Sequence, residues 1–241
     1  MTTYDTNRKT AIIAGTLLII ATFASILSNL FLKSVHSSDY LVEISANGNQ
    51  ITAGALLILI AAVTSASIAI SLYPVLKKYS EGLALGAVCF RLIEGVFYIV
   101  GILGLVLLLT LSQEFVQAGM PDASFFQILG TLLLAGREWA GFGIGPTAFG
   151  LGSLMYYSIF YQTELIPRWL SGWGLAGAVL CMVASVSVMS GLISPLSTIH
   201  IVLNLPIALQ EMVLAVWLIV KGFNPSAIAS LSLRTDINEV K

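Results

Sequence analysis

Six long apolar stretches, separated by short polar connectors, constrain this chain more than any other feature of its sequence. A helix needs about 20 apolar residues to cross the ~30 Å hydrocarbon core of a bilayer. The stretches that reach this length are Thr10–Leu32, Ile51–Leu76, Leu83–Leu111, Ala140–Tyr161, Trp169–Met189 and Thr198–Val220. Because 57% of the residues are hydrophobic and only 10% are charged, the chain cannot cover itself with a hydrated surface. We therefore predict an all-α protein of the lipid bilayer, a single domain built as a bundle of six transmembrane helices.

The segment at residues 125–135 does not fit this scheme, because it is too short to span a bilayer alone. Ser124 and Gln127 have the spacing of a capping box, which predicts that a helix begins here. We expect a short interfacial or re-entrant helix. The alternative is that the segment continues into the fourth stretch, but about 37 helical residues would then run ~55 Å, far beyond the bilayer. Several glycines and Pro146 favour a break or kink. The polar tail, residues 224–241, is expected to be loosely ordered.

The distribution of basic residues predicts the orientation in the membrane. With six spans, one side carries Arg8, Lys9, Lys77, Lys78, Arg168, Lys221, Arg234 and Lys241. The other side carries Lys33 and Arg137. The excess of positive charge places both termini in the cytoplasm. Aromatic residues near the predicted helix ends are expected at the membrane interfaces, and they are Tyr73, Tyr79, Trp139, Tyr156, Tyr157, Tyr161, Trp169 and Trp173.

Two polar stripes interrupt the apolar helices and mark the candidate site. The third stretch carries one of them at i, i+3, i+7 spacing, which places its members on one helix face: Arg91, Glu94 and Tyr98. The sixth stretch carries the other: His200, Asn204, Gln210 and Glu211. At about 1.5 Å per residue, Arg91 lies ~12 Å and Glu94 ~17 Å into the membrane, and Glu211 lies ~15 Å from the same side. The three charges are therefore expected at matching depth. Further contributors are expected nearer the opposite side: Arg137, Glu138 and His200.

Arg91 sets the chemistry of this centre, because a guanidinium does not give up its proton in a protein. It requires an anionic partner at membrane depth, which either Glu94 or Glu211 provides. The second carboxylate is then left over, and a desolvated, unpaired carboxylate tends to bind a proton or a cation. This favours a small permease or a membrane-embedded binding protein for a proton, a cation or a small molecule. The alternative is a structural or regulatory protein in which Arg91 bridges both glutamates as a static clamp between two helices.

Other function classes lack the residues that they need. The apolar stretches contain no aspartate and no lysine at mid-depth, and the whole chain has two histidines. These counts exclude a zinc-protease motif, an aspartyl pair, a two-histidine haem clamp and a retinal lysine, so we expect no metal and no cofactor. An intramembrane enzyme is the weakest hypothesis. The net charge of −1 offers no basic surface for nucleic acid. Nothing in the sequence sets an oligomeric state.

Four short pieces of the chain together carry a resemblance to a known family. They are Arg8-Lys9-Thr10-Ala11, Phe90-Arg91-Leu92-Ile93-Glu94, Pro167-Arg168-Trp169-Leu170, and the run from Leu203 to Pro225 that contains Pro206, Glu211, Trp217 and Lys221-Gly222-Phe223. In order and spacing they resemble the bacterial membrane family called domain of unknown function number 4386. The resemblance implies a single-domain, multi-pass protein of the bacterial inner membrane without an assigned activity. One departure is Arg137-Glu138, where the family favours an Arg-Asp pair.

Overall fold

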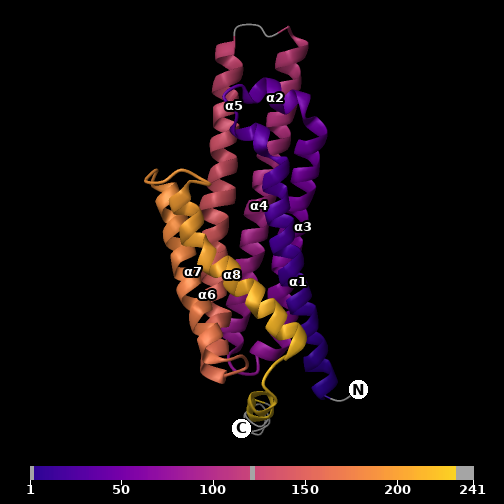
Figure 1. Ribbon diagram of the computed structural model, residues 1–241, viewed down its shortest axis with the longest axis vertical. Helices are drawn as coiled ribbons and strands as arrows, with labels where there is room; N and C mark the ends of the chain where they lie inside the picture. Colours follow the sequence, from indigo (N-terminus) through magenta and orange to yellow (C-terminus); the bar gives the residue numbers. More distant parts are fainter. Residues whose placement is uncertain (1–2, 120–122, 232–241) are drawn as a thin grey trace.

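The computed structural model describes residues 3–119 and 123–231, and this part of the chain is helical with turns between the helices and no strand. The elements are α1 (Thr3–Phe31), the 3-10 helix η1 (Lys33–His36), α2 (Tyr40–Ala46), α3 (Gly48–Leu76), α4 (Glu81–Gln117), α5 (Ala123–Glu138), the π-helix η2 (Trp139–Ile144), α6 (Gly145–Thr163), α7 (Arg168–Met189) and α8 (Thr198–Val220). Figure 1 shows the long helices side by side along the molecule, with α8 crossing obliquely. The predicted all-α class is confirmed.

Five of the described helices are long and apolar enough to cross a membrane. They are Thr6–Phe31 within α1, and α3, α4, α7 and α8. These five match the first, second, third, fifth and sixth of the predicted stretches, and the first ends one residue earlier than predicted, at Phe31. The fourth stretch, residues 140–161, lies in η2 and α6 and is not one of the five. The helices therefore fit a multi-pass membrane protein with five apolar spans by length and composition.

Residues 125–135 do not form a separate re-entrant or interfacial helix. They belong to α5, which continues through η2 into α6 without an interruption. The expected break is instead a π-helical turn, and Pro146, whose nitrogen carries no hydrogen, comes in the first turn of α6. The length argument against a continuous helix fails because α4 has 37 residues itself and is also ~55 Å long. These two long helical columns pack against each other and extend together beyond the other spans (Figure 1).

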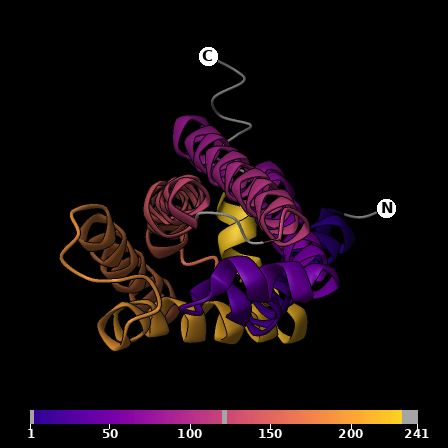
Figure 2. The ribbon, with the colours of Figure 1, turned by 90° about the horizontal axis from the view of Figure 1, so that it is seen from above.

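The spans pack in a closed ring. α1 contacts α3, α3 contacts α4, α4 contacts α6, α6 contacts α7, α7 contacts α8, and α8 returns to α1. Figure 2, a view from above, places α4 and most of α8 on opposite sides of this ring. Side chains on the inner faces of α4 and α8 therefore point toward a shared interior, which is where the two predicted polar stripes lie.

Serine caps fix where α4 and α8, the two helices with polar stripes, begin. The Ser80 side chain accepts a hydrogen bond from the Leu83 nitrogen at 3.4 Å, and the Ser197 side chain accepts one from the His200 nitrogen at 3.4 Å. Such caps satisfy backbone N–H groups that the first turn of a helix leaves without a partner. At the other end of α8, Arg8 donates to the carbonyl oxygens of Leu218 and Ile219, which ties α1 to the helix end.

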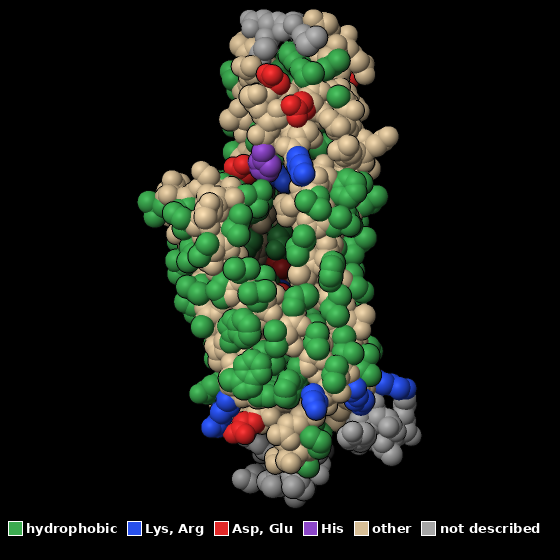
Figure 3. All heavy atoms as spheres, in the orientation of Figure 1, with side chains coloured by type: hydrophobic (Ala, Val, Ile, Leu, Met, Phe, Trp, Pro, Cys, Tyr) green, Lys and Arg blue, Asp and Glu red, His purple; other side chains and the backbone are tan. Residues whose placement is uncertain are grey.

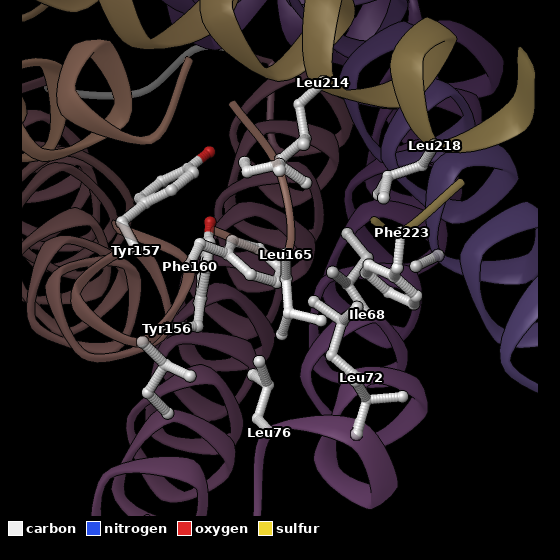
Figure 4. Close-up of a cluster of buried hydrophobic side chains, with 14 of the residues drawn as sticks. Ile68, Leu72, Leu76, Tyr156, Tyr157, Phe160, Leu165, Leu214, Leu218 and Phe223 are labelled. Carbon is white, nitrogen blue, oxygen red and sulfur yellow. The ribbon is translucent and has the colours of Figure 1, made fainter. Parts of the chain in front are cut away.

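Two apolar clusters hold the ring together. The cluster nearer the termini includes Leu72, Tyr156, Tyr157, Phe160 and Leu218, and Figure 4 shows these side chains converging from several helices. Tyr156 and Tyr157 are 1% and 0% exposed, so their predicted interfacial position is wrong. They lie inside because α6 is enclosed between α4 and α7, and the hydroxyl groups find partners within the bundle.

The second cluster lies where α2 packs against the outer half of α4. Its buried members are Leu32, Val35, Leu41, Ile44, Ile51, Ala55, Leu105, Leu108 and Phe115. Phe126 of α5 packs against Phe115 with ring centroids 5.2 Å apart. This cluster gives the outer ends of α4 and α5 an apolar core of their own.

The start of the polar tail is more ordered than the sequence indicates. Residues 225–231 are helical, and Ala227 and Leu231 are buried against the cluster nearer the termini. The expectation of loose order is therefore wrong for these residues, and residues 232–241 lie outside the described part of the chain. The first and last described residues lie at the same end of the molecule (Figure 1).

Candidate functional site

Arg91 lies in the interior of the ring and is 2% exposed. Its Nη1 donates to Oε2 of Glu94, one turn further along α4, at 3.0 Å. Its Nη2 reaches Oε1 of Glu211 on α8 at 3.5 Å. The structure thus brings together the three charges that the sequence places at one depth. Since α4 and α8 lie on opposite sides of the ring, the contact with Glu211 crosses its interior.

Two other helices complete the surroundings of the charges. From α3, the Ser65 hydroxyl donates to Glu94 Oε2 at 2.8 Å. From α6, the rings of Phe149 and Tyr156 lie 4.4 Å and 5.8 Å from the guanidinium carbon of Arg91, which places the cation against aromatic faces. Sequence reasoning missed all three residues. Ser65 is one of several hydroxyl residues on its helix, and nothing in the spacing distinguishes it from Thr64 or Ser67.

Small residues allow the neighbouring helices to come this close. A Cβ atom at Gly152 of α6 would lie 3.3 Å from Cγ of Arg91 and 3.2 Å from the backbone oxygen of Ala87. A Cβ atom at Gly95 of α4 would lie 3.4 Å from the backbone oxygen of Ala62 on α3. The absence of these side chains lets α3 and α6 pack directly against the turn of α4 that carries Arg91 and Glu94.

The two carboxylates are held unequally. The Glu94 side chain is 3% exposed and accepts hydrogen bonds from both Arg91 and Ser65. The Glu211 side chain is 14% exposed, and its one hydrogen bond to the described residues, from Arg91, is at the outer limit of hydrogen-bond length. Arg91 Nε has no hydrogen-bond partner among the described residues. One fixed cation therefore faces two carboxylates, and Glu211 is the less neutralised of the two.

A cavity of about 270 Å³ gives access to the carboxylates. Polar side chains that line it include Ser65, Arg91, Glu94, Tyr98, Asn204 and Glu211, and its apolar walls include Ile26, Ile68, Phe149 and Ile207. Since a water molecule occupies about 30 Å³ in the liquid, the cavity is large enough for several waters or a small organic molecule. Figure 3 shows a hollow on the apolar face of the molecule with an acidic side chain at its bottom.

Of the remaining members of the two predicted stripes, Tyr98 and Asn204 line the same cavity as the charges, whereas His200 and Gln210 do not. Tyr98 lines this cavity and also a second one. Asn204 lines it too, but its amide nitrogen donates to the His200 carbonyl oxygen at 2.9 Å. His200 packs against the ring of Phe142, with centroids 5.7 Å apart. Gln210 does not line the cavity, because its amide accepts from Tyr157 and donates to the Leu170 carbonyl oxygen at 3.1 Å.

The predicted contributors on the opposite side lie apart from Arg91. Arg137 is 6% exposed and lines the second cavity, of about 180 Å³. Glu138 is half-buried beside it. The second cavity shares Ser25 and Tyr98 with the first one, so the two cavities border each other. The structure therefore contains two distinct charged regions inside one ring of helices.

Comparison with known proteins identifies a family for this chain. A family model described as a domain of unknown function (DUF4386) matches residues 13–222. The matched region includes Arg91, Glu94, Arg137 and Glu211. No curated protein and no solved structure matches the chain significantly.

Proposed function

We propose that this chain, which belongs to the DUF4386 family, is a membrane permease or membrane-embedded binding protein that takes up a proton or a small cation at Glu211. The observation that carries the proposal is the unequal pairing of two carboxylates with one guanidinium. Glu94 already has two hydrogen-bond donors, whereas Glu211 faces the cavity with one long contact.

The proposed membrane placement has six crossings, with the α5–η2–α6 column as the fourth. It puts the termini in the cytoplasm, because Arg8, Lys77, Lys78, Arg168 and Lys221 belong to the end of the bundle where both termini lie (Figure 1). A band rich in hydrophobic side chains separates this end from a second level of charged side chains (Figure 3). The outer ends of α4 and α5, with the second apolar cluster, then project beyond the far surface of the bilayer.

Electrostatics supports uptake at Glu211. A net negative charge at membrane depth costs several kcal/mol unless a partner neutralises it. Arg91 neutralises one carboxylate, and the formal charge of the Arg91, Glu94 and Glu211 group is −1. A proton or a monovalent cation on Glu211 brings the group to neutrality. Because the side chain lines the cavity, such a partner reaches it without displacing a packed residue.

The lining of the cavity favours a small amphiphilic cation, such as an alkylammonium ion, over a bare metal ion. Its apolar walls suit carbon groups, and its carboxylate suits one positive charge. Ala21, Thr22 and Ile26 of α1 form one wall and Asn204 and Ala208 of α8 another, so it opens where these two helices diverge. The hollow in Figure 3 lies within the apolar band, which gives a ligand a route from the lipid.

A structural clamp is the second candidate. Arg91 is buried and touches α4, α6 and α8 at once, and Glu94 extends the network to α3 through Ser65. In that case the charges stabilise one arrangement of four helices and bind nothing. The two candidates differ in what removal of the Glu211 charge does to stability and to uptake.

The test uses the full chain in lipid vesicles with two probes, an imposed proton gradient read by a trapped dye and radiolabelled tetraethylammonium. We expect wild type to take up at least one probe, and Glu211→Gln to lose this uptake with little change in melting temperature. Glu164→Gln is the matched control, because Glu164 is exposed in a surface ion pair with Arg168. If Glu211→Gln lowers the melting temperature and wild type takes up neither probe, the clamp is correct. Uptake that is equal in wild type and Glu211→Gln also refutes the proposal.

A further inference from the structure

We propose that Arg137 forms a second, independent site that binds the anionic group, a phosphate or a carboxylate, of a ligand at the end of the bundle away from the termini. The first observation is that this guanidinium is buried without a counter-ion. Arg137 is 6% exposed, yet no carboxylate of the described residues lies within the 4.0 Å of an ion pair. Its Nη1 has no hydrogen-bond partner in the same part of the chain.

Burial of an unpaired charge costs several kcal/mol, so proteins keep buried cations beside anions. Glu138 follows Arg137 in the chain but forms no ion pair with it in the described structure. The ring of Phe142, 5.9 Å from the guanidinium carbon, gives weak compensation. The guanidinium therefore lacks the partner that its burial requires, and an anion from outside the chain supplies it.

Close packing of α4 against α5 fixes the backbone at Arg137. A small movement of α5 therefore does not expose the Arg137 side chain to solvent. A Cβ atom at Gly104 of α4 would lie 3.5 Å from Cβ of Arg137, and one at Gly101 would lie 3.8 Å from the backbone oxygen of Arg137. These two glycines let α4 and α5 pack closely at this turn. Arg137 lines the cavity of about 180 Å³ between α1, α3, α4 and η2 from this fixed position.

The lining of this cavity suits an anionic group with a short apolar attachment. Ser25, Ser28 and Asn29 of α1 contribute hydroxyl and amide groups, and Leu32 and Ile58 contribute apolar surface. The Ser28 hydroxyl and one N–H of Asn29 already donate to the Ser25 carbonyl oxygen, at 2.8 and 2.9 Å, so the Ser25 hydroxyl and the second N–H of Asn29 are the donors offered to a ligand. The planar guanidinium offers two parallel N–H donors, a geometry that matches phosphate and carboxylate oxygens. The volume accommodates such a group but not the acyl chains of a lipid, which would remain outside the cavity.

The position of the site suggests where the anion comes from. Leu32 lines the cavity, and η1, which contains Lys33 and His36, begins at the next residue. Charged side chains of both signs and a histidine gather at the edge of the hydrophobic band in Figure 3. A phospholipid phosphate lies at this level of a bilayer, and so does a small anion arriving from the water. Both sources would present the same kind of anionic group to Arg137.

This site is separate from the Arg91 centre. Along α4, Gly101 and Gly104 lie seven and ten residues beyond Glu94, which corresponds to ~10 and ~15 Å. Either site can be removed without altering the charges of the other one. A failure of the Glu211 proposal therefore leaves the Arg137 proposal intact, and the reverse holds too.

The experiment measures the melting temperature of the full chain in an uncharged detergent with four additives: phosphatidylglycerol, diacylglycerol, inorganic phosphate and acetate. We expect the anions to raise the melting temperature of wild type, because a ligand that binds the folded state stabilises it. Phosphatidylglycerol alone would identify a lipid headgroup, and phosphate or acetate would identify a small anion. Diacylglycerol, which lacks the phosphate, should have no effect.

Arg137→Gln should abolish this response, and Arg168→Gln, at an exposed arginine, should retain it. Without additives, Arg137→Gln should melt at or above the wild-type temperature, because it removes an unpaired buried charge. A purely structural arginine would give a lower temperature. The proposal is overturned if no anion stabilises wild type, or if Arg137→Gln responds as wild type does. Should Arg137→Gln not fold, Arg137→Lys replaces it, with anion affinity expected to fall about tenfold because the bidentate geometry is lost.

Discussion

Nη2 of Arg91 lies 3.5 Å from Oε1 of Glu211, although 120 residues separate the two in the chain. The contact crosses the interior of a ring in which α4 packs between α3 and α6, and α8 packs between α7 and α1. A single guanidinium therefore connects opposite walls of the bundle while it also pairs with Glu94 on its own helix.

Replacing Arg91 should have the largest effect on stability. Arg91→Met leaves Glu94 and Glu211 without their cation, and we expect a loss of about 3–5 kcal/mol in the free energy of unfolding. Arg91→Lys should lose less, because the charge remains while the fork geometry is lost. Unfolding in mixed micelles measures both. Arg168→Met is the control, since its exposed pair with Glu164 contributes at most about 1 kcal/mol. Equal losses for Arg91→Met and Arg168→Met would be incompatible with a buried centre.

The two carboxylates should respond differently to neutralisation. Glu94→Gln weakens the contacts with both Arg91 and Ser65, and we expect about 3 kcal/mol of destabilisation. Glu211→Gln loses one long contact, leaves Arg91 paired with Glu94 and removes the surplus negative charge, so it should cost less than Glu94→Gln does. The same unfolding measurement compares them. A larger loss for Glu211→Gln than for Glu94→Gln would contradict the assignment of Glu94 as the structural partner of Arg91 and of Glu211 as the carboxylate that binds a proton or a cation.

Much of this centre follows from the sequence. Helical spacing alone places Arg91 and Glu94 on one face, and equal distances from the helix ends bring Glu211 to their level. The contributions of Ser65, Phe149 and Tyr156 could not be predicted, because they depend on how α3 and α6 rotate against α4. Tyr156 is an example. An aromatic residue near the end of an apolar stretch is predicted at the membrane interface, but the packing of α6 against its neighbours buries this one.

The helices themselves were predicted best where apolar length decides the outcome. The stretches within α1, α3, α4, α7 and α8 are all found, whereas residues 125–135 were misjudged. A helix that must fit within the bilayer cannot be this long, but α4 and the α5–η2–α6 column extend together beyond the other spans and share an apolar cluster around Phe115. Apolar length alone does not predict this extension.

Close packing of α1 against α8 should make Gly15 sensitive to a single methyl group. A Cβ atom there would lie 2.7 Å from the Ala215 carbonyl oxygen and 2.8 Å from Cγ1 of Ile219, so Gly15→Ala should cost about 1–3 kcal/mol. Gly136→Ala is the matched control. Its Cβ atom would meet nothing within 4 Å in the described structure, and loss of a helical glycine should stabilise by about 0.5–1 kcal/mol. Thermal unfolding of both variants tests this, and a neutral Gly15→Ala would show that α1 and α8 are not closely packed.

Stability should also depend on pH through His36 in η1. Partial burial and the positive charge of Arg137 lower the pKa of His36 below its usual value. The unfolded chain therefore binds the proton more readily, and the folded state should lose stability as pH falls through about 6.5 and below. His36→Gln should reduce this loss in a comparison of melting temperatures at two pH values. A steeper pH dependence in His36→Gln would contradict the direction of the pKa shift.

The most direct test of the central claim is whether Glu211 itself takes up a proton. Infrared difference spectra of the protein in vesicles, between about pH 8 and about pH 6, report newly protonated carboxylic acids, while exposed glutamates with a pKa of about 4.3 stay ionised. We predict a carboxylic acid band in wild type and in Glu164→Gln that is lost in Glu211→Gln and suppressed by tetraethylammonium. Glu94→Gln should weaken the band as well, because Arg91 then has Glu211 as its one carboxylate partner and the group is already neutral. The absence of the band from wild type, or its persistence in Glu211→Gln, would contradict the account.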